Sequence, residues 1–69
     1  MENDITTIGN GMYSWEVIIG YYECPFNDEH QREITIMADY KSEISRIIDD
    51  NFSGMVVVYI DGVSVYYNN

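Results

Sequence analysis

The pair Asp61-Gly62 separates two runs of apolar, strand-forming residues near the end of the chain. Asp-Gly is strongly preferred in two-residue type I′ turns, because both turn positions need a positive φ that these residues tolerate. Residues 55–60 and 63–67 are therefore predicted to form an antiparallel β-hairpin, with Ile60 opposite Val63.

Counting back from this turn divides the hairpin into two faces, because alternate residues of a strand point to opposite sides. The face predicted to enter the core carries Ile60, Val63, Val58, Val65, Val56 and Tyr67. The other face carries Tyr59, Ser64, Val57 and Tyr66, with Ile18 and Tyr22 expected to join it from an earlier strand. We expect this second face to stay at least partly exposed to solvent.

Two further segments alternate between apolar and other residues. Odd positions are apolar throughout residues 13–21, and residues 32–38 place Ile34, Ile36 and Ala38 on one side. This period of two predicts two strands. Residues 24–30 contain Pro25 and two turn-forming residues, so we expect a hairpin loop that makes the strands antiparallel.

The apolar spacing changes to that of a helix after Asp39, which is a favourable N-cap residue. The predicted helix spans residues 40–51 and ends at Gly54, which suits the left-handed position that follows a helix. Its apolar face consists of Tyr40, Ile44, Ile47, Ile48 and Phe52.

These elements predict a single α+β domain over residues 1–69, with residues 1–11 as an irregular N-terminal segment. The predicted order is ββαββ, an antiparallel sheet of about four strands with one helix packed on one face. A single helix covers only one face of such a sheet.

The chain is strongly acidic, with twelve Asp and Glu against three Lys and Arg, for a net charge of −9. Such a field repels phosphates and anionic membranes, so direct nucleic-acid or membrane binding is disfavoured, and it attracts basic protein surfaces. The alternative is that the acidity only keeps a tyrosine-rich protein soluble. Cys24 is the only cysteine, and we find no leader or membrane-spanning apolar run, so a cytoplasmic location is expected.

Catalytic chemistry has little support in the sequence. The single cysteine and single histidine, Cys24 and His30, fall in one loop without an orienting third group. Ligation by Cys24, Asp28, Glu29 and His30 would mix soft and hard donors without paired spacing. We therefore predict no enzyme activity, no metal site and no cofactor.

Binding features are better supported, and we predict seven partner-binding residues. Four are acidic residues of the predicted helix and its N-cap: Asp39, Glu43, Asp49 and Asp50. Three are tyrosines, a residue type enriched in interfaces: Tyr22, Tyr59 and Tyr66. An edge strand offers another route to a partner, and a homodimer would cover the outer sheet face.

The segment Arg32-Glu33-Ile34-Thr35-Ile36-Met37 is similar to the second-strand segment of the Dmd antitoxins of T-even phages. The resemblance extends to the acidic-ended helix and to Ile60-Asp61 at a tight turn, and it covers about half the chain. It implies a phage protein that neutralises a host ribonuclease toxin by binding it. This chain is longer, more acidic and richer in tyrosine in its closing hairpin, so no contact residue is transferred. A small acidic domain of this kind also resembles anti-CRISPR and anti-restriction inhibitors, some of which mimic DNA.

The leading hypothesis from the sequence is a small phage-encoded inhibitor. It would bind the basic surface of a host defence nuclease, toxin or CRISPR effector. One alternative is a DNA-mimic antagonist of a nucleic-acid-binding protein. Another is a structural or self-associating accessory subunit without an inhibitory role.

Overall fold

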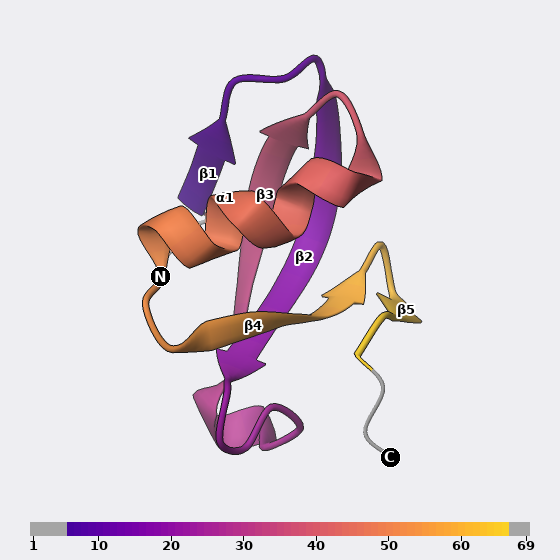
Figure 1. The fold of residues 1–69 in the computed structure, drawn as a ribbon. Coiled ribbons are helices and arrows are strands. Elements are labelled where there is room, and N and C mark those ends of the chain that lie inside the picture. Colours follow the sequence, from indigo (N-terminus) through magenta and orange to yellow (C-terminus); the bar gives the residue numbers. More distant parts are fainter. Residues whose placement is uncertain (1–5, 67–69) are drawn as a thin grey trace.

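The computed structural model describes residues 6–66 and has the predicted α+β architecture (Figure 1). Five strands form one mixed, mostly antiparallel sheet in the order β1-β3-β2-β4-β5. The strands are β1 (Thr6–Gly9), β2 (Tyr13–Tyr21), β3 (Arg32–Ala38), β4 (Met55–Ile60) and β5 (Val63–Ser64). The helical elements are two 3₁₀ turns, Asp28–His30 and Lys41–Glu43, and the helix α1 (Ile44–Asn51).

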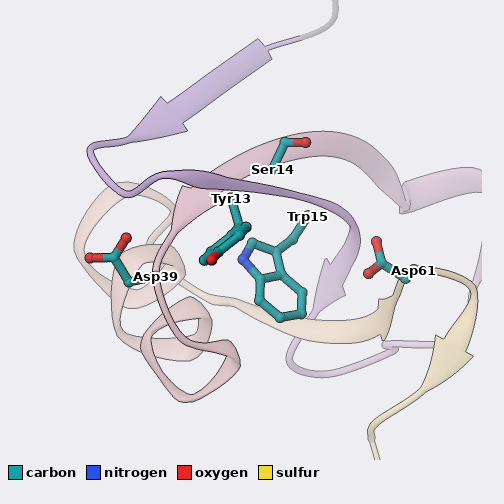
Figure 2. Close-up of a pocket in the computed structure, with 5 residues that line it drawn as sticks. All are labelled: Tyr13, Ser14, Trp15, Asp39 and Asp61. Carbon is teal, nitrogen blue, oxygen red and sulfur yellow. The ribbon is translucent and has the colours of Figure 1, made fainter.

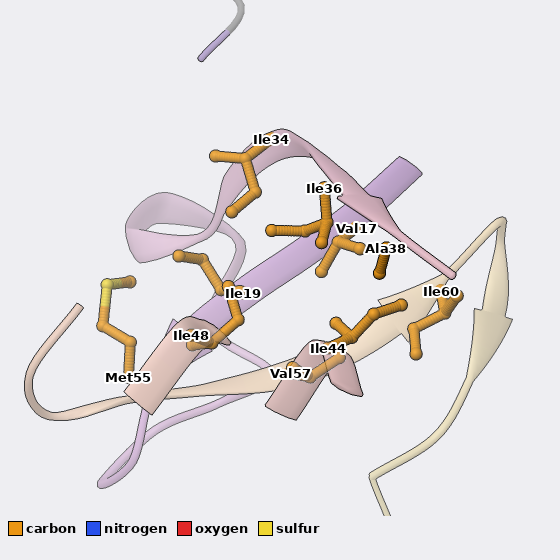
Figure 3. Close-up of a cluster of buried hydrophobic side chains, with 10 residues drawn as sticks. All are labelled: Val17, Ile19, Ile34, Ile36, Ala38, Ile44, Ile48, Met55, Val57 and Ile60. Carbon is orange, nitrogen blue, oxygen red and sulfur yellow. The ribbon is translucent and has the colours of Figure 1, made fainter. Parts of the chain in front are cut away.

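The hydrophobic core lies between the sheet and α1, which crosses one sheet face (Figure 1). Ile44 and Ile48, one turn apart on α1, are fully buried against this face. Figure 3 shows the cluster that they join: Val17, Ile19, Ile34, Ile36, Ala38, Ile44, Ile48, Met55, Val57 and Ile60. The alternation that predicted β2 and β3 is confirmed, because the central apolar residues of β2 and the apolar residues of β3 belong to this cluster, while Tyr13 and Tyr21 at the ends of β2 are exposed.

The expectation of an irregular segment over residues 1–11 is wrong for residues 6–9, which form β1. This strand pairs with β3 in parallel, with Ile8 opposite Ile36. The sequence reading missed it because four residues, two of them threonine, carry little periodicity of their own. The strand exists because the outer edge of β3 offers unpaired backbone groups and an apolar neighbour for Ile8.

The hairpin turn is confirmed. Asp61 and Gly62 have φ values of 51° and 83°, and Ile60 pairs with Val63 as predicted. The Val65 N–H also donates to the Val58 carbonyl, 2.9 Å away.

The predicted division of the hairpin into two faces is only partly correct. The pairing of β2 with β4 shifts by one residue between Ile18 and Ile19, which leaves Val58 as the extra residue of a β-bulge. Val57 therefore points into the core, contrary to the prediction, while Ile18 and Tyr59 remain neighbours on the opposite face.

The members of the predicted core face differ in their burial. Val58 is fully buried, whereas Val56 and Val65 are half-buried. Val63 is 62% exposed because it lies in the two-residue edge strand β5, so its assignment to the core is wrong. Tyr67 lies outside the described residues.

The helix α1 begins at Ile44, later than predicted, and ends at Asn51 as predicted. Residues 41–43 form a 3₁₀ turn whose N-cap is Tyr40, without a side-chain cap hydrogen bond. Asp39 is therefore not the N-cap, because its carboxylate is bonded elsewhere. Gly54 has a φ of 81°, as expected for a residue that follows a helix. No helix within residues 6–66 is long and apolar enough to cross a membrane.

The loop between β2 and β3 folds back against the sheet at Gly20. A Cβ atom at this position would lie 2.5 Å from the Pro25 carbonyl oxygen, so only glycine fits there. The Phe26 ring packs edge-on against Tyr66, with centroids 5.6 Å apart. The loop and the segment after β5 therefore cover part of the sheet face that α1 does not cover.

Candidate partner-binding surface

A concavity of about 400 Å³ opens to solvent at the beginning of β2. It forms because β4 ends with Ile60 opposite Val17 and the turn residue Asp61 binds Glu16, while β2 extends beyond that point to Tyr13. The five residues that line it are Tyr13, Ser14, Trp15, Asp39 and Asp61. Figure 2 shows the two aromatic rings between the two carboxylates. We name these five residues the end surface.

Two hydrogen bonds fix Asp61 at one side of the end surface. Its backbone N–H donates to the Glu16 carbonyl at 2.6 Å, and the Glu16 N–H donates to Asp61 Oδ1 at 2.9 Å. The side-chain oxygen thus replaces the backbone carbonyl that a longer β4 would offer. One carboxylate oxygen is used in this way, and the side chain remains exposed.

We expect Asp61→Ala to lower the free energy of unfolding by about 2 kcal/mol, and Asp61→Asn to lower it by less than about 1 kcal/mol. Alanine disfavours the positive φ and leaves the Glu16 N–H without its acceptor, whereas asparagine retains both properties. Urea denaturation followed by Trp15 fluorescence measures both variants. Equal losses for alanine and asparagine would mean that the charge, and not the hydrogen bond, holds the turn.

Asp39 occupies the opposite side of the end surface and is held in a similar way. The Met12 N–H donates to Asp39 Oδ1 at 2.9 Å, which ties the β1–β2 connection to the end of β3. The Asp39 N–H in turn donates to Glu43 Oε1 at 3.3 Å. Both aspartates therefore bind a backbone N–H through one oxygen.

The floor of the end surface is aromatic. The indole Nε1–H of Trp15 donates to the Ala38 carbonyl at 2.9 Å, which fixes the orientation of the half-buried ring. Tyr13 is two residues earlier on the same side of β2 and is 64% exposed. The Trp15 ring packs against the hydrophobic core on its inner side, whereas most of the Tyr13 ring is exposed to solvent.

Ser14 contributes its backbone N–H and C=O groups to the end surface. The N–H and C=O of Glu16 both face the Asp61 turn, and backbone groups two residues apart on an antiparallel strand point to the same side. The N–H and C=O of Ser14 therefore point past the end of β4, toward the concavity that Ser14 lines.

The acidic residues predicted to bind a partner occupy two separate places. Asp39 belongs to the end surface, and Glu43 is bonded to it. Asp49 and Asp50 are exposed near the end of α1, where Asp49 lines a smaller groove of about 230 Å³ between α1 and β4. The helix therefore does not present all four as one continuous row.

The predicted tyrosines do not form one continuous surface. Tyr66 is half-buried against Phe26, and Tyr59 is half-buried opposite Ile18 in the sheet. Tyr22 is 68% exposed, but it follows the end of β2 that is remote from the end surface.

Sequence reasoning did not select Tyr13, Ser14, Trp15 or Asp61 as binding residues. Tyr13 and Trp15 share the apolar side of β2, so their pattern indicated core residues. Asp61 was explained completely by the turn. One feature of the sequence could have indicated this surface. The segment that forms β2 has nine residues and the segment that forms β4 has six, so β2 must extend beyond β4.

The loop that contains Cys24 and His30 does not bring aromatic and acidic side chains together as the end surface does. Cys24 is a half-buried free thiol, and His30 lies against Tyr21, with ring centroids 5.3 Å apart. Within residues 6–66, no three His, Cys, Asp or Glu side chains are grouped so that they could hold a metal ion.

No protein-family model matches this chain, and neither a search of curated proteins nor a search of solved structures gives a match. The function of this chain is therefore inferred from its own residues and geometry, together with the segment that is similar to the Dmd antitoxins.

Proposed function

We propose that this chain is a small acidic protein inhibitor that binds a basic surface of a nuclease or toxin and blocks it. The observation that carries the proposal is the end surface, where the exposed ring of Tyr13 and the half-buried ring of Trp15 lie between two carboxylates. Tyr and Trp are enriched among residues that dominate binding energy, and carboxylates complement a basic partner.

The net charge of −9 supports the same kind of partner. A nucleic-acid-processing enzyme presents a basic surface to phosphate, and an acidic protein is drawn to that surface by the same field. We take the partner to be a host defence protein, either a toxin of the kind that the resemblance to phage antitoxins implies or a CRISPR effector. The inhibitor acts by occupying the surface and needs no chemistry of its own.

The proposal is tested by capture followed by an activity assay. The immobilised chain is exposed to a lysate of the native host, each captured protein is purified, and its nuclease activity is measured as the chain is added. We expect stoichiometric loss of activity. A captured nuclease that retains full activity at saturation contradicts the inhibitor role.

Salt dependence of the same complex separates a packed interface from DNA mimicry. A mimic that binds chiefly through carboxylates should lose affinity by orders of magnitude between about 50 and 200 mM salt, by analogy with phosphate contacts. An interface anchored by aromatic rings should lose much less. We expect the weaker dependence, because the end surface has an aromatic floor and only two lining carboxylates.

A further inference from the structure

We infer that the end surface binds an extended segment of the partner, which adds to the sheet as a further strand beside Ser14. The added strand lies along β2 in the line of β4, beyond the residue at which β4 ends. Strand addition of this kind supplies affinity through main-chain hydrogen bonds. The inference rests on the proposed function and names the form of the partner segment that this surface accepts.

The pairing of β2 with β3 also shows that the backbone N–H and C=O of Ser14 are open. Met37 lies opposite Ser14, and its carbonyl accepts the N–H of Gly11, two residues after β1 ends, at 2.9 Å. The Met37 carbonyl therefore serves the β1 side of β3, and Ser14 and Met37 form a non-hydrogen-bonded pair. On the other side of β2, none of the described strands has a residue opposite Ser14.

The concavity provides room for an added strand at this place. Ser14 lines it together with Tyr13 and Trp15, its two neighbours in the sequence. In an antiparallel strand, the residue opposite Ser14 exchanges two hydrogen bonds with it. The residues on either side of that one lie opposite Tyr13 and Trp15, where β-branched side chains form stabilising cross-strand pairs with aromatic rings.

Asp61 determines where the added strand carries a positive charge. Because Asp61 is bonded to Glu16, the added residue opposite Trp15 is one strand position away, roughly 3.4 Å along the strand. An Arg or Lys at this residue lies beside a carboxylate that is exposed and already oriented by the Glu16 N–H. The net charge of −9 favours the same basic segment.

A second copy of the chain does not fit this place. If the β2 strands of two copies paired around Ser14, the second copy's Met12 would lie opposite Glu16, where Asp61 is already bonded. Two chains that each carry a charge of −9 would also repel each other. We therefore assign the place to a basic segment of another protein.

The test uses the peptide acetyl-Arg-Thr-Val-amide, designed with threonine opposite Ser14 and arginine opposite Trp15. The ¹⁵N-labelled chain is titrated with it, and we expect saturable NMR shifts centred on the Ser14 amide. N-methylation of the threonine removes the donor to the Ser14 carbonyl and should weaken binding about tenfold. N-methylation of the valine, whose N–H faces away from β2, is the matched control and should weaken binding less than about threefold.

Two pairs of variants test the same contacts from the chain. Ser14→Pro removes the open N–H and should weaken the peptide about tenfold, whereas Ser14→Ala keeps the backbone and should change binding by less than about twofold. Asp61→Asn should weaken it about threefold, and Asp49→Asn, which removes the same charge from α1, less than about 1.5-fold. A dispersed amide spectrum confirms that each variant is folded. If Ser14→Pro does not fold, the two N-methylated peptides decide the question.

Equal weakening by the two N-methylations, or the absence of a saturable shift at Ser14, would overturn the inference. Comparison with the captured nuclease separates it from the proposed function. If folded Ser14→Pro inhibits that nuclease as well as the unaltered chain does, strand addition is wrong and the inhibitor proposal stands. If the peptides behave as expected but captured nucleases remain fully active, the strand site stands and the inhibitor proposal fails.

Discussion

Replacing Ile44 with alanine is expected to lower the free energy of unfolding by about 3–4 kcal/mol. Ile44 is fully buried between α1 and the sheet, so the substitution removes buried methyl and methylene groups and leaves a cavity. Domains of this length are stable by roughly 3–10 kcal/mol, so the loss is a large share of the total. Urea denaturation followed by the fluorescence of Trp15, the only tryptophan, measures it.

Ile47→Ala is the matched control, because it makes the same chemical change at a half-buried position of the same helix. We expect it to cost only about 1–1.5 kcal/mol. If Ile44→Ala does not fold, Ile44→Val should show a loss of about 1 kcal/mol. Equal losses at positions 44 and 47 would mean that α1 does not pack on the sheet as described.

Replacing Tyr13 with alanine is expected to weaken binding to a captured partner by about 30-fold or more, the effect of an interface residue that dominates affinity. Tyr13 is exposed, so the substitution should leave the stability of the domain nearly unchanged. Titration calorimetry of the purified complex measures the affinity, and urea denaturation checks the fold.

Tyr22→Ala provides the control for this prediction. Tyr22 is as exposed as Tyr13, but it lies beyond the opposite end of β2, a strand of nine residues and thus roughly 30 Å away. We expect less than about a threefold change in affinity. A larger loss at Tyr22 than at Tyr13 would transfer the interface to the other end of the domain.

Most of the fold could be predicted from the sequence, because its signals are local. Alternation over residues 13–21 and 32–38 depends only on neighbouring residues, and the Asp61-Gly62 turn depends only on the φ values of two residues. The β1 strand could not be predicted in this way. It is held by pairing with β3, whose residues are more than twenty positions away in the sequence.

The bulge at Val58 explains why the faces of β4 were only partly predicted. Counting from the turn assumes that one register continues along the whole strand, but β4 must also pair with β2. The extra residue satisfies both neighbours and turns Val57 into the core. No local property of three consecutive valines indicates where such a shift occurs.

The candidate site was harder to predict than the fold, because its position depends on where β4 ends relative to β2. Asp39 was selected as an acidic helix residue, and the structure places it instead beside Tyr13 and Trp15. Asp61 joins them from a hairpin that is more than forty residues away in the chain. Composition predicted the sign of the charge, but it contained no information about which aromatic rings lie between the carboxylates.

The backbone hydrogen bonds of Asp39 and Asp61, together with that of the Trp15 indole, have a consequence for the entropy of binding. A side chain that is immobilised only when a partner arrives costs about 0.5–1.5 kcal/mol of binding free energy. These three side chains are already restrained in the free protein, so most of that cost is met during folding. A domain of 69 residues can offer only a small contact area, and prior ordering of its contact groups raises the affinity that such an area can reach.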